Sequence, residues 1–396
     1  MSAYSDSSDE HPPDSELICD GPYSIIHKTH RPSTAPPDTC TQAQCFATKT
    51  ATLVKKFSKE PHDILKEAHI LSRLSHPNVI QMLECWQDEE RQTLNFQMPF
   101  VPYGLDALLA APGFSFHDCP LPVPPHPLLR GGEPLEKLMK GIAKGIFEAL
   151  AYLHHPDQHI AHRDVKPANV LLMPDAQVKL IDFGVSFDCH HSSDEQETVL
   201  WAEPEGKMYF EVSTGAYRAP ELLFGTRAYD PFAVDLWSAG CLLAEFFTPL
   251  KKHHPDGSED SFADSDDEED TGTTSPREPF ILPSKAGHLQ DDFEDGEWER
   301  VTLFDGERGE LGLIGSIFKI RGTPTDASWR DFKNLPGATL LSFMTFPRVP
   351  LLPLLPNLPP SPEESEKAVN LIERLVEYPP EARLSASEAL KHSWFS

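Results

Sequence analysis

Polar residues that could carry out phosphoryl transfer lie close together in residues 160–184. Asp164, Lys166 and Asn169 fall within six positions, and Asp182 follows thirteen positions after Asn169. Two short apolar runs between Asn169 and Asp182 surround a turn sequence and predict a hairpin, which brings the four side chains into one cleft. There an aspartate can accept a hydroxyl proton, a lysine can neutralise a moving phosphoryl group, and aspartate with asparagine can hold magnesium. The four residues therefore predict metal-assisted phosphoryl transfer.

Four short motifs resemble those of the eukaryotic protein kinases and occur in the order that this family has. Residues 162–164 (His-Arg-Asp) resemble its catalytic loop, and residues 182–184 (Asp-Phe-Gly) resemble its magnesium-binding motif. Residues 219–221 (Ala-Pro-Glu) and 235–238 (Asp-Leu-Trp-Ser) resemble motifs that follow in the large lobe. A single aspartate in a turn is usually a helix cap or a solvated charge, but chance explains four ordered motifs poorly.

The resemblance implies a fold of the α+β class, the bilobal protein kinase fold. A small β-rich N-lobe with one helix, αC, would pack on a large, mainly helical C-lobe, and ATP and Mg²⁺ would be the cofactors. We therefore predict a disordered N-terminus and one kinase domain with insertions, with these bounds: N-terminus 1–15, kinase domain 16–396, N-lobe 16–101, C-lobe 102–396, insertions at about 111–133, 188–207 and 251–298.

The family pattern implies a role for each motif residue. Asp164 would be the catalytic base, and Lys166 would assist it in the form of the loop found in serine/threonine kinases. Asn169 and Asp182 would hold Mg²⁺. Thr214 would lie beside Asp164 and Lys166, and Glu221 would form a buried ion pair with Arg383. The residues expected to act structurally or in regulation are Arg163, Thr214, Arg218, Glu221, Asp235 and Arg383.

The ATP-binding residues are marked by shorter motifs. The run Leu53-Val54-Lys55 lies in an alternating segment, residues 50–57, that predicts a strand, so we expect Lys55 to contact the ATP phosphates. The adjacent Lys56 is the alternative. Glu67 lies in a helical pattern that resembles αC and should pair with Lys55, which implies a trimmed connection between strand and helix. Met98 would be the gatekeeper, and Phe100 and Val101 would offer backbone groups to adenine. The expected ATP-binding set is Lys55, Glu67, Met98, Phe100, Val101 and Leu171.

A glycine-rich loop, which in kinases covers the ATP phosphates, is missing from its expected place. Two predicted strands, residues 17–19 and 23–26, lie on either side of Gly21, and residues 27–45 hold no further glycine. The sequence therefore does not predict a tight backbone clamp on the phosphates.

The activation segment, residues 182–221, lacks the threonine whose phosphate usually pairs with the arginine of the catalytic loop. Counted back from Arg218, the aligned position is Tyr209, and the unpaired arginine is Arg163. A tyrosine is not an anion at neutral pH, so another group must pair with Arg163.

Two explanations for the pairing of Arg163 stay open. We expect a carboxylate, either Glu211 or one from residues 203–205, to pair with it and hold the segment without phosphorylation. The alternative is phosphorylation of Thr198 or Ser213.

The large lobe resembles cyclin-dependent kinases in particular. Residues 217–223 (Tyr-Arg-Ala-Pro-Glu-Leu-Leu) have the form seen in cyclin-dependent and MAP-type kinases, and residues 317–324 resemble the segment after the αG helix. Residues 63–67 lack the cyclin-docking sequence of cell-cycle kinases. With the weak glycine loop and the missing threonine, these features resemble the monomeric fungal CDK-activating kinases, which phosphorylate the activation-loop threonine of cyclin-dependent kinases.

This resemblance implies a monomeric serine/threonine kinase that acts on protein substrates, among them cyclin-dependent kinases, without dependence on a cyclin. One alternative is a pseudokinase that binds partners with weak or no phosphotransfer, which the missing glycines suggest. Another is a conventional cyclin-dependent or MAP-type proline-directed kinase. The pseudokinase is disfavoured because a scaffold has no chemical reason to keep the whole catalytic set: Lys55, Glu67, Asp164, Lys166, Asn169 and Asp182.

Composition excludes several other classes of protein. The formal net charge of −28 argues against non-specific binding of nucleic acid, and residues 256–270 alone carry nine acids. No apolar run approaches the length of about 18 residues that a membrane span needs. Seven scattered cysteines indicate a reducing compartment, so we expect the protein in the cytoplasm, the nucleus or both.

Overall fold

The computed structural model describes residues 15–31, 44–117, 124–190, 199–203, 206–253, 280 and 297–396. The predicted disordered N-terminus, apart from Ser15, and most of the predicted insertion at 251–298 lie outside these ranges. Within them, no helix combines the length and the apolar composition that crossing a membrane requires.

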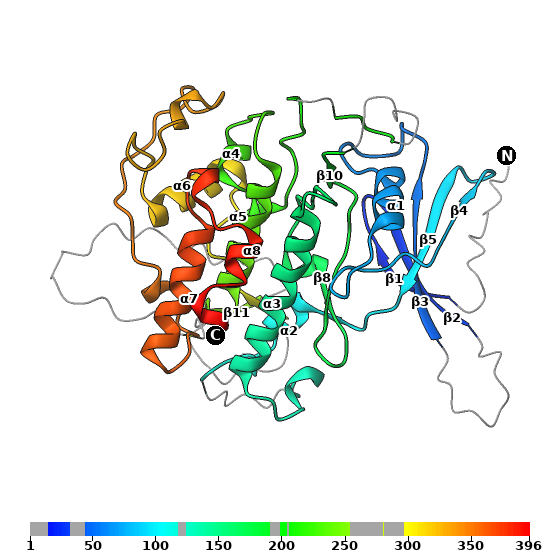
Figure 1. The fold of residues 1–396 in the computed structure, drawn as a ribbon, viewed down its shortest axis with the longest axis horizontal. Helices are drawn as coiled ribbons and strands as arrows, with labels where there is room; N and C mark the ends of the chain where they lie inside the picture. The colour runs from blue at the N-terminus through cyan, green and yellow to red at the C-terminus, as the bar shows by residue number, and fades with distance from the viewer. Residues whose placement is uncertain are drawn as a thin grey trace, which may run out of the picture.

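The N-lobe is built on a five-stranded antiparallel sheet, drawn at the right of Figure 1, with the order β1-β2-β3-β5-β4. Helix α1 (Ile64–Arg73) packs beside it, at the position predicted for αC. Asp63 precedes and caps this helix, since its side chain accepts hydrogen bonds from the N–H groups of Leu65 and Lys66 in the first turn. The strands are β1 (Ser15–Asp20), β2 (Ile25–Arg31), β3 (Gln44–Thr52), β4 (Glu84–Asp88) and β5 (Thr93–Pro99).

The strand predicted over residues 50–57 is wrong, because β3 starts and ends earlier in the chain. Its position is decided by pairing with β2 and β5, which places Lys49 opposite Phe96 in the middle of the sheet. Beyond the end of β3 the chain turns, and this turn takes Lys55 out of the sheet.

The C-lobe is mainly helical and carries three small sheets. Strands β6, β8 and β9 form one sheet, β7 pairs with β10, and β11 pairs with β12. The helices are α2 (Leu105–Ala110), α3 (Leu135–His154), α4 (Pro220–Leu223), α5 (Pro231–Glu245), α6 (Gly309–Arg321), α7 (Pro362–Leu375) and α8 (Ala386–Ala389). The strands are β6 (Tyr103–Gly104), β7 (Ile160–Ala161), β8 (Val170–Leu172), β9 (Val178–Leu180), β10 (Phe187–Asp188), β11 (Leu250–His253) and β12 (Glu297–Arg300).

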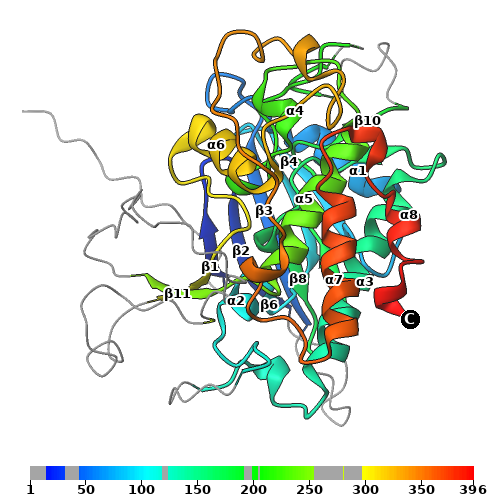
Figure 2. The ribbon, with the colours of Figure 1, turned by 90° about the vertical axis from the view of Figure 1, so that its left-hand side faces the viewer.

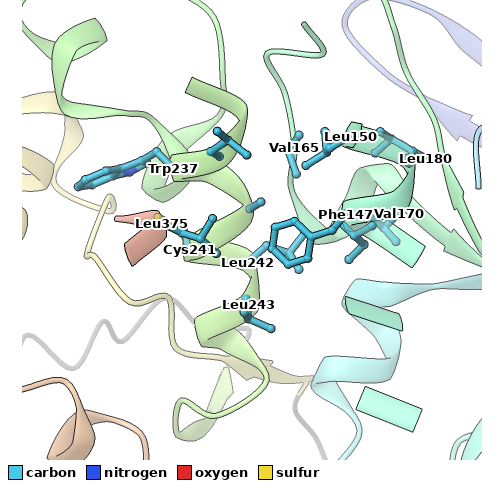
Figure 3. Packing of buried hydrophobic residues seen from close by; sticks show 14 of the residues in the cluster. Phe147, Leu150, Val165, Val170, Leu180, Trp237, Cys241, Leu242, Leu243 and Leu375 are labelled. Atoms are coloured by element: carbon cyan, nitrogen blue, oxygen red, sulfur yellow. The ribbon is translucent and has the colours of Figure 1, made fainter. Parts of the chain in front are cut away.

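Helix α5 is the centre of the C-lobe core. Every residue of this helix except Phe232 is buried, as expected for a helix that is apolar on all sides. Helices α3 and α7 lie beside it in Figure 2, and Figure 3 shows Phe147 of α3 and Leu375 of α7 packing near Cys241 and Leu242. A fixed α5 gives the catalytic loop a rigid support.

Gly240 permits the close approach of α5 and α7. A Cβ atom added at Gly240 would lie 2.8 Å from the Cβ of Leu375 and 2.8 Å from Cγ1 of Val376, which is closer than such atoms pack. The predicted α+β, bilobal arrangement is confirmed, since the β-rich N-lobe and the helical C-lobe are joined through the segment between β5 and α2 (Figure 1).

Candidate active site

A cleft of 660 Å³ lies between the two lobes and is lined by most of the predicted catalytic, ATP-binding and metal-binding residues. Neither Lys55 nor the hinge residues Phe100 and Val101 are among the residues that line it. The predicted residues that line the cleft are Glu67, Met98, Asp164, Lys166, Asn169, Leu171, Asp182 and Thr214. The fold therefore assembles in one place residues that are far apart in the chain.

Lys49, not Lys55, is the lysine of this cleft. Its Nζ lies 2.7 Å from Oε2 and 2.9 Å from Oε1 of Glu67, and 2.9 Å from Oδ1 of Asp182. Lys55 instead places its Nζ 5.4 Å from the ring centre of Trp201, outside the cleft. The predicted pairing of Lys55 with Glu67 is therefore wrong.

The alternative, Lys56, is wrong as well, since its Nζ lies over the ring of Phe57. The sequence contained a signal against both residues, namely the short spacing that a lysine at 55 leaves before Glu67. Lys49 lies 18 residues before Glu67. The prediction of a trimmed connection between strand and helix is therefore wrong, because it counted the spacing from Lys55 and not from Lys49.

Lys49 and Asp182 each stabilise the charged form of the other, whereas burial raises the pKa of the Glu67 carboxyl to about 6. Burial alone would lower the pKa of the Lys49 amine, but the carboxylates of Asp182 and Glu67 raise it above its ordinary value. Burial would likewise raise the pKa of the Asp182 carboxyl, and the neighbouring Lys49 lowers it well below its usual range. At neutral pH the cleft thus holds an ammonium group between two carboxyl groups.

The catalytic loop is held by Asp235 of α5, which is fully buried. Its Oδ2 accepts the N–H of His162 at 2.7 Å, and its Oδ1 accepts the N–H of Arg163 at 2.6 Å. Arg163 has a φ of 61°, a left-handed conformation that costs free energy unless the surroundings stabilise it. Asp235 therefore positions the backbone that precedes Asp164, in agreement with the structural role expected of it.

Asp164, Lys166 and Thr214 form a triangle of hydrogen bonds. The Thr214 hydroxyl donates to Oδ1 of Asp164 at 2.8 Å, and the Lys166 Nζ donates to Thr214 Oγ1 at 2.7 Å. The same Nζ lies 2.9 Å from Oδ2 of Asp164. The prediction that Thr214 lies beside this pair is confirmed. An aliphatic hydroxyl thus fits between the aspartate and the lysine.

Asn169 and Asp182 present oxygen atoms suited to a divalent cation. The amide Nδ2 of Asn169 donates to Oδ2 of Asp164 at 2.9 Å and to its backbone oxygen at 2.8 Å. This leaves Oδ1 of Asn169 and Oδ2 of Asp182 without hydrogen bonds from the residues that the structure describes. Carboxylate and amide oxygens are hard ligands for magnesium or calcium, so this donor set fits a divalent cation.

Met98 and Leu171, which were predicted to contact adenine, both line the cleft. The N–H of Phe100 already donates to the backbone oxygen of Cys45 at 3.1 Å, so Phe100 can offer adenine only its carbonyl. The backbone groups of Val101 have no partner within the described ranges. Of the two expected hinge residues, only Val101 has a free N–H.

Arg163 pairs with Glu203, one of the carboxylates expected to replace a phosphate. Its Nη1 lies 2.8 Å from Oε2, and its Nη2 lies 2.5 Å from Oε1. Burial alone would raise the pKa of Glu203, but the Arg163 guanidinium lowers it to about 2. Of the other candidates, Glu211 is exposed and makes no ion pair with Arg163, and Glu205 lies outside the described residues. The prediction of a carboxylate partner is confirmed for Glu203.

Two further pairs hold the activation segment and the C-lobe together. Arg383 lies 2.7 Å and 2.8 Å from the two carboxylate oxygens of Glu221, so the predicted buried ion pair is confirmed. Arg218 pairs with Glu310 of α6 and donates to the backbone oxygen of Phe210 at 2.8 Å. These contacts give Arg218, Glu221 and Arg383 structural positions.

Comparison with known proteins places the chain in a family. The family model described as the protein kinase domain matches residues 39–395. Cell division control protein 2 homolog 3 of Trypanosoma brucei brucei is 26% identical over 386 residues, which cover 96% of this chain and 90% of that protein. Cyclin-dependent kinase D-1 of Arabidopsis thaliana is 26% identical over 96% of this chain and 70% of its own length.

Relatives named as CTD kinases are similar too. The CTD kinase subunit alpha of Schizosaccharomyces pombe is 27% identical over 85% of this chain, which corresponds to 41% of that protein. A chain of the yeast RNA Pol II CTD kinase CTDK-1 complex has the same fold, with a TM-score of 0.58 and 22% identity over 96% of this chain and 94% of that one. The chain belongs to the protein kinase domain family, and its relatives are cyclin-dependent-kinase-like.

Proposed function

We propose that this chain is a serine/threonine kinase that uses Mg²⁺ and ATP to phosphorylate the activation-loop threonine of cyclin-dependent kinases. The observation that carries the proposal is the pair between Glu203 and Arg163. A kinase that activates other kinases must be active before any of them, and a built-in carboxylate provides the order that phosphate usually brings.

The triangle around Asp164 supports hydroxyl-bearing side chains as substrates. Thr214 shows where an aliphatic hydroxyl can lie, 2.8 Å from Oδ1 of Asp164. A substrate hydroxyl in that place would donate its proton toward Asp164, while Lys166 would neutralise charge on the moving phosphoryl group. Asn169 and Asp182 would hold the Mg²⁺, which supplies charge neutralisation between the ATP phosphates.

Contacts between α1 and the activation segment support activity without a cyclin. The buried carboxylate of Asp63 accepts the N–H groups of Leu200 at 2.5 Å and Trp201 at 2.9 Å. Lys66, in the first turn of α1 that Asp63 caps, lies 3.3 Å from Oε1 of Glu203. These bonds hold α1 where Glu67 reaches the lysine of the cleft, so the chain itself does what a partner would otherwise do. We therefore propose a monomer. The seven scattered cysteines favour a reducing compartment, so we propose that it acts in the cytoplasm or nucleus.

The test uses bacterially expressed, phosphatase-treated protein with radiolabelled ATP and a panel of unphosphorylated cyclin-dependent kinases, with and without their cyclins. Label should appear on the activation-loop threonine and disappear when that threonine in the substrate is replaced by alanine. The matched control is Asp164→Asn, which should fold but not transfer phosphate.

The alternatives give different results in this experiment. A pseudokinase would transfer no more label than Asp164→Asn does. A conventional proline-directed kinase would label Ser-Pro or Thr-Pro sites in general substrates and leave the activation-loop threonine unlabelled. Either result would reject the proposed substrate.

A further inference from the structure

The turn between β1 and β2 is poor in hydrogen-bond donors where a glycine-rich loop would offer several. The N–H of Gly21 is already bonded to the backbone oxygen of Ser24 at 3.0 Å, and Pro22 has no N–H. Two of the four residues in the turn therefore cannot donate to a phosphate through the backbone. Another group must take over this contact if ATP is to be held from that side.

A stacked pair of rings stands at this place in the cleft. Tyr23, in the turn, and His62, just before α1, have ring centres 3.5 Å apart and planes inclined by 21°. Both residues line the cleft between the lobes. The Nζ of Lys59 lies 5.9 Å from the centre of the Tyr23 ring, on the same rim of the cleft.

The imidazole of His62 lies on the phosphate side of the cleft. A Cβ atom built on Gly184 would be 3.3 Å from Nδ1 of His62, so the ring lies directly against the residue that is two positions after Asp182. The adenine side, at Met98 and Leu171, belongs to other elements. The stacked rings of Tyr23 and His62 thus cover the end of the cleft where Lys49 and Asp182 lie.

The imidazole is also uncommitted. Its side chain makes no hydrogen bond within the described ranges, although it is half-buried in a cleft whose lining includes the charged Lys49 and Asp182. A ring nitrogen that carries a hydrogen is a good donor to an anionic oxygen. Stacking on Tyr23 limits rotation of the ring and keeps this donor at the cleft.

We propose that His62 is a phosphate-binding residue that donates a ring N–H to a phosphate oxygen of bound ATP, and that Tyr23 is the positioning residue that holds this ring. The side-chain donor replaces backbone donors that the short turn does not supply. This inference rests on the proposed function only in taking ATP as the phosphoryl donor.

The test compares binding of ATP and of adenosine by calorimetry, with Mg²⁺ and without any protein substrate. His62→Phe keeps a flat ring that can stack on Tyr23 but removes the donor. We expect ATP to bind about 10–100-fold more weakly, since hydrogen bonds to charged groups contribute at that level. Adenosine affinity should not change, because adenosine has no phosphate. The melting temperature should not change either, because the phenylalanine ring keeps the stacking on Tyr23.

His76→Phe is the matched control, because His76 also stacks on a tyrosine, Tyr152, but lies outside the cleft. It should leave ATP affinity as in the wild type. Tyr23→Ala should weaken ATP binding less than His62→Phe, and kinetics of both variants should show a raised KM for ATP.

The outcomes separate this inference from the proposed function. If the wild-type protein does not bind ATP, the proposed function as an ATP-dependent kinase is refuted. Wild-type protein that binds ATP with the same affinity as His62→Phe would refute only the role of His62. Equal losses of ATP and adenosine affinity would also refute it, because they would indicate a general disturbance of the cleft.

Discussion

The ion pair between Glu203 and Arg163 leads to the sharpest prediction. Both side chains are buried, and Glu203 also accepts the N–H of Tyr209 at 3.0 Å and lies 3.3 Å from the Lys66 amine. Glu203→Gln keeps the shape of the side chain and removes its charge. The buried guanidinium of Arg163 then loses its counter-charge, and the activation segment loses the charge that pairs with Arg163 and Lys66.

The pKa of Glu203 gives the size of the effect. It falls from an ordinary 4.5 to about 2. Each pKa unit corresponds to about 1.4 kcal/mol, so the charged pairs stabilise the folded state by about 3 kcal/mol. This agrees with a loss of about 3–5 kcal/mol on breaking a buried pair from one side.

The sign of the pH dependence follows from the lowered pKa. A carboxyl group with a lowered pKa stabilises the fold fully above its unfolded-state pKa, and this contribution is lost as the pH falls through the folded-state pKa. The difference in unfolding free energy between wild type and Glu203→Gln should therefore be full at pH 7. It should shrink below about pH 4.5 and vanish near pH 2.

Thermal unfolding and kinase assays measure the two consequences. For a domain of this size, about 3 kcal/mol corresponds to a fall in Tm on the order of 5 °C. Activity of the phosphatase-treated variant should fall by roughly 10–100-fold, because the segment is no longer held in order. Glu211→Gln is the control for stability, since Glu211 is exposed and does not pair with Arg163. Equal Tm values for the two variants would show that the charge of Glu203 does not stabilise the fold.

The remaining predictions concern the cleft and α1. Lys49→Met should lower kcat/KM on the order of 10²–10³-fold and Lys55→Met less than about twofold, because only Lys49 reaches Glu67 and Asp182; a larger loss in Lys55→Met would contradict this assignment. Asp164→Asn should fold with unchanged Tm and lose on the order of 10²–10⁴ in kcat, and wild-type turnover would show that Asp164 is not the base. Asp63→Ala should destabilise α1 by about 1–2 kcal/mol and speed hydrogen exchange at the N–H groups of Leu200 and Trp201. Exchange at these two groups that is as slow as in the wild type would show that Asp63 does not hold the activation segment.

Local sequence determined the catalytic loop and the residues beside it. Asp164, Lys166 and Asn169 are close along the chain, and the hairpin of β8 and β9 brings Asp182 back to them. Short-range geometry of this kind follows from turn residues and apolar alternation. The spacing of the motifs was therefore enough to predict that these four side chains lie together. The position of Thr214 and the pairing of Glu221 with Arg383 also agreed, because the resemblance to protein kinases extends over the whole large lobe.

Tertiary structure alone decided which lysine enters the cleft. Lys49 has Ala47 two positions before it and Lys55 has Leu53 two positions before it, so each lysine shares a strand face with an apolar residue. The choice depends on the pairing of β3 with β5, whose residues are about 50 positions away, and this pairing ends β3 at Thr52. A strand register is set by partners that are distant in the chain, so local pattern could not select it.

The same reason applies to the partners of Arg163 and His62. Several carboxylates were suitable by charge, and Glu203 was selected because the activation segment docks on α1 through Asp63 and Lys66. No local pattern marked His62, whose meaning depends on Tyr23 approaching from a turn about 40 residues earlier. The sequence by itself thus determined the chemistry and its catalytic loop, while contacts between distant segments determined the lysine, the substitute for phosphate and the stacked rings that cover one end of the cleft. These contacts depend on packing in three dimensions, which no local pattern encodes.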